Sequence, residues 1–121
     1  MSVGVWAGVG LLGGIGALLR FFLDGLIATR AGRDFPLGTF VINISGATIL
    51  GLLVGLGFTG NRLLLAGTAT LGSYTTFSTW MLESQRLVED GELRIAGANM
   101  LVSLLVGAGA AALGRLIGTH L

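Results

Sequence analysis

Long runs without a charged residue dominate the pattern of hydrophobic and polar positions along the chain. Each of four such runs ends at an arginine or an acidic residue, and together they cover residues 1–19, 35–61, 63–82 and 95–114. A helix needs about 20 apolar residues to cross a hydrocarbon core that is roughly 30 Å thick. The pattern therefore predicts four transmembrane helices, which we place near residues 3–23, 37–58, 62–83 and 95–117.

Polar and charged residues gather in the short connections between these runs. We interpret residues 24–36, which include charges, a glycine and the only proline, as an interfacial loop or a short amphipathic turn. Residues 59–61 are typical of a tight turn, and residues 83–94 form a second charged connection. Four helices joined by short loops predict an up-down bundle with both termini on one side.

The composition indicates a lipid solvent. Of the 121 residues, 53% are hydrophobic and 11% are charged, whereas soluble domains carry roughly 25% charged residues. We therefore expect a single all-α transmembrane domain over residues 1–121. Residues 1–19 lack the basic stretch and the cleavage site of a signal peptide, so we interpret them as a retained span. A net charge of +1 excludes a basic nucleic-acid-binding surface, and the absence of cysteine excludes a disulfide.

Glycine accounts for 22 residues and lies mostly inside the predicted spans. Small residues four apart allow two transmembrane helices to approach closely. This spacing occurs at Gly4/Gly8, Gly10/Gly14, Gly51/Gly55 and Gly114/Gly118. We interpret these glycines as packing surfaces. Because four short helices enclose little volume, an aqueous path would need a second subunit, and we expect a homodimer.

The arginines give only a weak bias in membrane orientation. The side that holds residues 24–36 and 83–94 has Arg20, Arg30, Arg33, Arg86 and Arg94, and the other side has Arg62 and Arg115. Because arginine favours the cytoplasmic side, this distribution leans toward both termini outside. A bias this small also fits insertion in both orientations.

A cluster of hydroxyls interrupts the third run, in the sequence GSYTTFSTWMLE at residues 72–83. The hydroxyl side chains that follow Gly72 are Ser73, Tyr74, Thr75, Thr76, Ser78 and Thr79. They cannot all donate to carbonyls of their own helix. We therefore predict that the third helix is broken near the middle of the membrane, where irregular backbone persists only if protein or water satisfies it. Broken helices of this kind often coordinate ions.

Other polar and aromatic side chains inside the spans have more than one interpretation. Asn43 either bonds to a neighbouring helix or donates into an aqueous path, whereas Ser45 can bond back to its own helix. Arg20 either extends to the membrane interface or places a positive charge at the mouth of a pore. Phe77 and Trp80 lie three apart and share one helix face, in packing or in a site.

The chemistry of these groups favours an anion. Hydroxyl hydrogens, amide hydrogens and the edges of aromatic rings all carry positive electrostatic potential. They suit a small, strongly hydrated anion that exchanges its water for donors. A cation or a coupled proton is less suited, because the spans contain no carboxylate before Glu83. The sequence has no carboxylate pair, nucleophile–base set or HExxH motif, so we do not expect an enzyme.

Three motifs, in order along the chain, resemble those of the CrcB/Fluc fluoride channels. They are GGIGALLR at residues 13–20, GTFVINISG with Gly51 at residues 38–51, and GSYTTFSTWMLE at residues 72–83. The resemblance covers nearly the whole chain. It implies an antiparallel, dual-topology homodimer in the plasma (inner) membrane, with two narrow pores that pass fluoride, exclude chloride and lower cytoplasmic fluoride.

The resemblance also implies roles for individual residues. Backbone carbonyls of Gly72 and Thr75 from both subunits would hold a structural Na⁺ that is not transported. The residues that would line the fluoride pore are Asn43, Phe77, Trp80, Ser78 and Thr79. Those with a looser or accessory role are Ser103, Arg20 and Glu83. Trp80 and Tyr74 depart from the family pattern, which has a phenylalanine and often a smaller residue there. The indole of Trp80 keeps a positive edge and adds an N–H donor, so an anion site could persist there.

Two alternatives stay open at this point. A small multidrug transporter shares the four spans and the dual topology, but that class binds cations and protons through a glutamate in its first span. Residues 1–19 contain no glutamate. A non-transporting membrane subunit that packs through its glycines would leave the hydroxyls of residues 72–79 unexplained.

Overall fold

A computed structural model describes residues 1–30 and 35–121, and every regular element in these two ranges is helical. The elements are α1 (Val3–Arg30), α2 (Leu37–Gly55), α3 (Gly60–Leu63), η1 (Leu64–Leu71), α4 (Gly72–Tyr74), α5 (Ser78–Glu89) and α6 (Leu93–Thr119). Element η1 is a π-helix, whose hydrogen bonds join residues five apart. Helices α1, α2 and α6 are long and apolar enough to cross a membrane. The structure confirms an all-α chain and indicates a multi-pass membrane protein.

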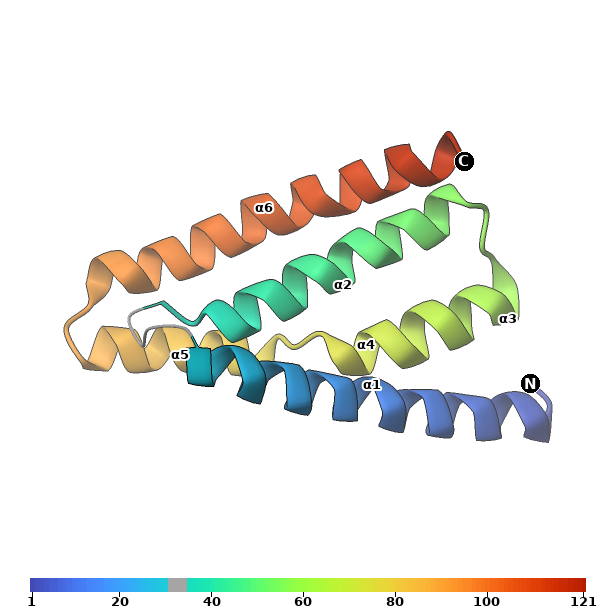
Figure 1. Ribbon diagram of the computed structural model, residues 1–121, viewed down its shortest axis with the longest axis horizontal. Helices are drawn as coiled ribbons and strands as arrows, with labels where there is room; N and C mark the ends of the chain where they lie inside the picture. Colours follow the sequence, from blue (N-terminus) through green and yellow to red (C-terminus); the bar gives the residue numbers. More distant parts are fainter. Residues whose placement is uncertain (31–34) are drawn as a thin grey trace.

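The elements lie side by side along one long axis (Figure 1). Helix α6 packs mainly against α2, while α1 packs against η1 and α4. Elements α3, η1, α4 and α5 follow one another along a single path, which we call the third segment (residues 60–89). The N- and C-termini lie at the same end of the molecule, as the up-down order predicts.

The extents predicted for two connections are wrong, because the charged residues at the helix ends continue the helices. Helix α1 runs on to Arg30, so residues 24–30 of the predicted loop are helical. Helix α5 runs on to Glu89 and α6 begins at Leu93, so most of residues 83–94 is helical as well. In α5 the added residues include glutamate, glutamine and arginine, which are good helix formers, so a charge does not by itself end a helix. Arg33, which we assigned to the first connection, lies outside the described residues.

The turn after α2 begins earlier than predicted. Helix α2 ends at Gly55 rather than near residue 58, and residues 56–59 lead into α3. Gly57 has a φ of +89° and Gly60 has a φ of +55°, a left-handed backbone that glycine adopts without strain. Gly57, together with Gly60 inside the predicted turn at residues 59–61, therefore determines where the chain turns.

Two of the four glycine pairs form the contact between α2 and α6. A methyl group at Gly51 would strike the carbonyl of Ala111, and one at Gly114 would strike the carbonyl of Thr48. The other members of these pairs meet the opposing backbone in the same way; they are Gly55 and Gly118. The packing role predicted for these two pairs is confirmed, since the two backbones touch where no side chain intervenes.

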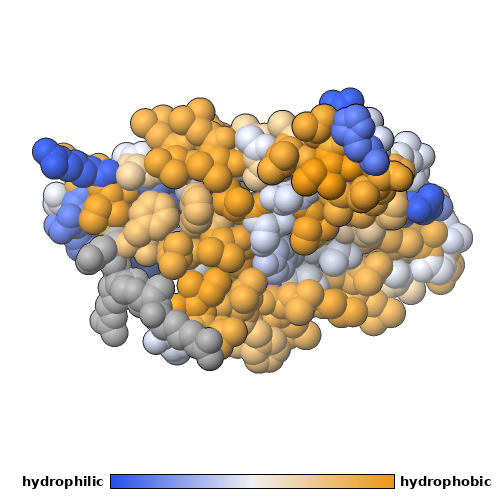
Figure 2. Space-filling model, turned by 45° about the horizontal axis from the view of Figure 1, so that its top comes forward, coloured by the Kyte–Doolittle hydropathy of each residue, from blue (hydrophilic) through white to orange (hydrophobic). Residues whose placement is uncertain are grey.

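The pair Gly10/Gly14 on α1 has a different environment. No atom of the described chain lies within 4 Å of a methyl group placed at either position. Much of α1 and α6 also presents large apolar side chains outward. Figure 2 shows a face that is mostly apolar, with its most hydrophilic residues near the two ends. Such a surface is unsuited to water and is typical of a protein covered by lipid or by another subunit.

Gly114→Ala should destabilise the folded protein, because the added methyl group would strike the Thr48 carbonyl and push α2 away from α6. We expect a loss of about 1–3 kcal/mol, the usual cost of overpacking a close contact. Gly109→Ala lies on the same helix with no neighbour within 4 Å, so this matched control should be neutral or slightly stabilising. Thermal unfolding in detergent checks both variants, and equal melting temperatures would contradict the packing role.

Candidate functional site

The helical path of the third segment is broken at residues 75–77, between α4 and α5. Thr75 has a φ of −77° and a ψ of 165°, which is an extended conformation. The break predicted for the hydroxyl-rich sequence is therefore present, shortly after Gly72. A break separates backbone N–H and C=O groups from their helical partners, and those groups need others.

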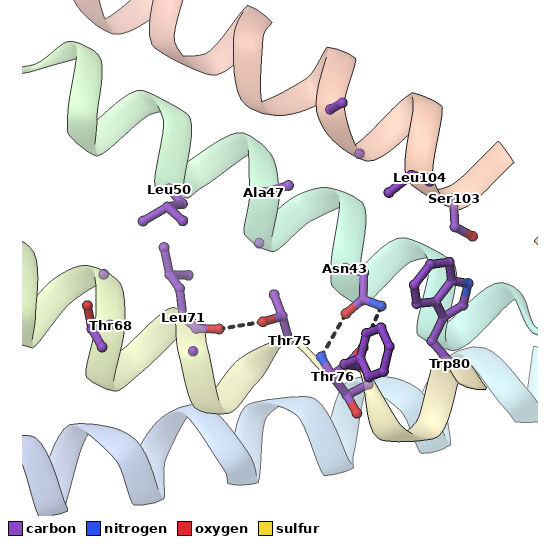
Figure 3. A pocket seen from close by; sticks show the side chains of 16 residues that line it. Asn43, Ala47, Leu50, Thr68, Leu71, Thr75, Thr76, Trp80, Ser103 and Leu104 are labelled. Atoms are coloured by element: carbon purple, nitrogen blue, oxygen red, sulfur yellow. Dashed lines mark hydrogen bonds between the residues drawn. The ribbon is translucent and has the colours of Figure 1, made fainter. Parts of the chain in front are cut away.

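The carboxamide of Asn43 on α2 supplies two of these partners (Figure 3). Its Nδ2 donates to the carbonyl of Thr76 at 2.8 Å, and its Oδ1 accepts from the N–H of Thr76 at 2.8 Å. The interhelical interpretation of Asn43 is thus confirmed. An amide nitrogen carries two hydrogens, so the second hydrogen of Nδ2 remains for the space beside the break.

Two further side chains bind the backbone on either side of the break. The hydroxyl of Thr76 accepts from the N–H of Thr79 at 3.2 Å and so caps the start of α5. Arg20 on α1 donates through Nε to the carbonyl of Ser73 at 3.3 Å. The guanidinium of Arg20 is therefore held beside the break.

Three backbone carbonyls at the break, those of Gly72, Tyr74 and Thr75, have no hydrogen-bond partner among the described residues. The space beside Gly72 is open, with no atom within 4 Å of a methyl group placed there. Carbonyl oxygens are ligands that a hard cation takes. The donor set at the break therefore fits a small hard cation.

Helix α2 approaches the break closely through the sequence NISG at residues 43–46. A methyl group at Gly46 would strike the methyl group of Thr75, so glycine permits this approach. The hydroxyl of Ser45 lies 2.9 Å from the hydroxyl of Tyr74. The large side chain of Tyr74 is thus accommodated, and it fastens the first half of the third segment to α2.

The other hydroxyls of the cluster have different partners. Ser73 and Thr75 donate back to carbonyls of the preceding turn, at 2.8 and 3.0 Å. Ser78 lies 3.4 Å from the hydroxyl of Thr76. The prediction that these hydroxyls cannot all bond back is confirmed, since those of Tyr74 and Thr76 bond elsewhere.

A cavity of about 560 Å³ lies beside the break, between α2, the third segment and α6. It brings together six of the predicted site residues, namely Asn43, Gly72, Thr75, Phe77, Trp80 and Ser103. The remaining residues that line it are apolar or glycine, apart from two threonines, and none of them is charged. The cavity is therefore an uncharged space with a few polar side chains in its wall.

Two aromatic rings meet at this cavity. The rings of Phe77 and Trp80 lie edge to face, with centroids 5.6 Å apart and an interplanar angle of 77°. Phe77 is 70% exposed in the single subunit. The N–H donor that Trp80 adds is used within the subunit, because its Nε1 donates to the carbonyl of Asn99 on α6 at 3.0 Å.

Asn99 is a residue of this region that the sequence prediction missed. It is fully buried, and its Nδ2 donates to the hydroxyl of Ser84 at 2.8 Å. Ser103 donates to its Oδ1 at 3.4 Å. Asn99 is the only amide in the fourth apolar run, and a buried amide in an apolar helix needs partners. That isolation is the signal that could have identified it.

Four predicted site residues do not line the cavity, namely Arg20, Glu83, Ser78 and Thr79. The carboxylate of Glu83 accepts a hydrogen bond from the hydroxyl of Thr39, which is buried on α2. The other three residues lie close to the break. Arg20 donates to the carbonyl of Ser73, the hydroxyl of Ser78 lies near that of Thr76, and the N–H of Thr79 donates to the Thr76 hydroxyl.

The chain is similar in sequence, over most of its length, to proteins that are named as fluoride channels. A protein of Mycolicibacterium paratuberculosis named Fluoride-specific ion channel FluC 2 is 57% identical over 94% of this chain and 93% of its own length. A protein of Mycobacterium tuberculosis with the same name is 52% identical over 97% and 93%. Fluoride-specific ion channel FluC of Geotalea daltonii is 43% identical over 81% and 83%.

The similarity extends on both sides of the break. Residues 7–115 match the family described as CrcB-like protein, Camphor Resistance (CrcB). This range includes α2, the whole third segment and most of α6, which together enclose the cavity. The chain therefore belongs to the CrcB family.

Proposed function

We propose that the chain is a subunit of a fluoride-selective ion channel, and not an enzyme, through which fluoride leaves the cell passively so that cytoplasmic fluoride falls. Relatives that are 52% and 57% identical over almost the whole chain carry the name fluoride-specific ion channel. The observation that carries the proposal is the uncharged cavity at the break, whose wall contains an amide, hydroxyl side chains and two aromatic rings.

The cavity has the chemistry that a small anion requires. Fluoride holds its water strongly, so a selective path must replace that water with other donors. The second Nδ2 hydrogen of Asn43 and the positive edges of Phe77 and Trp80 would meet the ion there. No residue that lines the cavity is acidic and repels an anion, and none is basic and traps it. Conduction needs binding that is weak enough to release the ion, and a few neutral donors meet that condition.

The predicted site residues outside the cavity would extend the path. Ser78 and Thr79 at the start of α5 would continue a track of hydroxyls from Ser103, which lies in the cavity wall on α6. Arg20 would keep a positive charge near the break and raise the local anion concentration. Glu83, held by a hydroxyl of α2, would stand farther along α5.

We infer that the third segment also crosses the membrane, which gives four crossings with α1, α2 and α6. We also infer that two subunits form an antiparallel homodimer in the plasma (inner) membrane. The third segment follows the same long axis as α1, α2 and α6. The cavity is open, and most of the Phe77 ring is exposed, so a second subunit would complete the wall of the path. The weak arginine bias permits both orientations, which an antiparallel pair requires.

Carbonyls of Gly72 and Thr75 from both subunits would hold a structural Na⁺. Their oxygens have no donor within the described chain, and oxygen ligands of this kind suit a hard cation. A bound Na⁺ would supply fixed positive charge between the two breaks and would not be transported. The carbonyls would thereby gain a partner in a medium where water is excluded.

Liposomes that contain the purified protein should release fluoride once the membrane potential is dissipated, and they should retain chloride. A fluoride electrode measures the release, and protein-free liposomes give the background. Because a passive channel needs no coupling ion, an imposed pH gradient should not be required. Fluoride release that occurs only with a proton gradient would indicate a transporter, and release of both halides at similar rates would contradict selectivity.

Phe77→Leu should reduce fluoride release to the background of protein-free liposomes, because leucine has no positive ring edge to replace water. Phe21→Leu is the matched control, since Phe21 is 71% exposed on α1 and does not line the cavity. Both variants should unfold at the temperature of the unmodified protein. Normal release by Phe77→Leu would show that the path runs elsewhere.

The melting temperature should rise with Na⁺ concentration when ionic strength is held constant with N-methylglucamine. A ligand that binds only the folded dimer stabilises it by about 2.7 kcal/mol at roughly 100 times its dissociation constant. Potassium at the same concentration should give a smaller rise, because it is a larger cation. A melting temperature that is independent of Na⁺ would argue against the site at Gly72 and Thr75.

A further inference from the structure

A closed ring of hydrogen bonds joins Trp80 to two buried polar residues behind the cavity. We propose that Ser84 and Asn99 are positioning residues that hold the indole of Trp80 with its N–H bonded to α6 and a carbon edge presented to the anion path. This orientation sets how fast and how selectively the anion passes. The inference rests on the proposed function, because it assigns new residues to the same path.

The ring of bonds begins and ends on Trp80. Its Nε1 donates to the backbone carbonyl of Asn99 at 3.0 Å. The side-chain amide of Asn99 donates to Ser84 at 2.8 Å, and the hydroxyl of Ser84 donates to the carbonyl of Trp80 at 2.9 Å. The side chain and the backbone of Trp80 are thus both tied to the same residue of α6. In Figure 3 the indole nitrogen lies on the side of the ring away from Asn43.

The network lies in a dry interior. Asn99 is 0% exposed and Ser84 is 3% exposed. Every buried side-chain nitrogen and oxygen of the described residues has a partner. A buried polar group that loses its partner cannot turn to water, so this arrangement is favoured over others and fixes the side chains within it.

The direction of the indole N–H matters for an anion path. An N–H that pointed into the cavity would bind an anion more tightly than a ring edge does, and it would slow the release of the ion. Because the indole N–H of Trp80 donates to the Asn99 carbonyl, it is not available to an anion in the path. The ring then offers C–H edges, as Phe77 does, and the edge-to-face contact keeps the two rings together. Asn99 and Ser84 therefore allow a tryptophan to act as a phenylalanine would.

The test is a double-mutant cycle between Asn99→Leu and Trp80→Phe, with Ser84→Ala as the milder variant. Asn99→Leu and Ser84→Ala should each change the ratio of fluoride to chloride release by about tenfold, a coupling typical of residues in one network. After Trp80→Phe, which removes the N–H, the same two substitutions should have little effect on that ratio. Thr48→Val removes a hydroxyl that bonds only within α2 and is the matched control, with no expected change.

A spectroscopic measurement tests the same network without transport. Trp6 is the only other tryptophan, so Trp6→Phe leaves the fluorescence of Trp80 alone. In that background, Asn99→Leu and Ser84→Ala should shift the emission maximum and lower the anisotropy, because the indole becomes more mobile.

A merely structural role would lower the melting temperature while the halide ratio and the fluorescence stayed unchanged, and this result would overturn the inference. Equal effects before and after Trp80→Phe would overturn it too. If Asn99→Leu does not fold, Ser84→Ala decides the question. If the unmodified protein carries no fluoride, the proposed function fails, whereas the fluorescence still shows whether Ser84 and Asn99 hold the indole.

Discussion

The pairing of the Asn43 carboxamide with the backbone of Thr76 is the interaction on which the rest of the structure depends. In hydrocarbon a helix can be interrupted only if other groups complete its hydrogen bonds. One side-chain amide offers both a donor and an acceptor with the geometry of a peptide group, at 2.8 Å each. The cavity and the free carbonyls of Gly72 and Thr75 both follow from a backbone that leaves the helix here and resumes it at Ser78.

The order of the helices and the position of the break can be predicted from the sequence, because both follow from one constraint. Charges and unpaired polar groups are excluded from an apolar layer. Charge-free runs identify α1, α2 and α6, and the excess of hydroxyls after Gly72 identifies the break. The ends of the helices are not predictable in this way. Residues 24–30 and 84–89 carry charges at the edge of the layer, yet they propagate the helices that precede them.

Several side chains that the sequence singles out lie together in the fold, but their hydrogen bonds could not be predicted. Asn43, Phe77 and Trp80 do converge on one cavity. Which way the indole donates depends on the position of the Asn99 carbonyl, and that position is a property of how α5 packs on α6. A composition-based prediction counts Trp80 as an extra donor, whereas the folded chain has already used that donor.

The π-helix before the break constrains how the length of this chain can vary. A residue in a π-helix turns the chain through a smaller angle than one in an α-helix, and the Thr70 hydroxyl supports the wide turn by bonding to the Leu65 carbonyl at 2.7 Å. The direction in which Gly72 points about the helix axis therefore depends on the number of residues in η1. Deletion of one residue there would rotate the break about its axis. Insertions and deletions among related chains should accordingly collect in residues 56–59, where a loop absorbs them, and should be absent from η1.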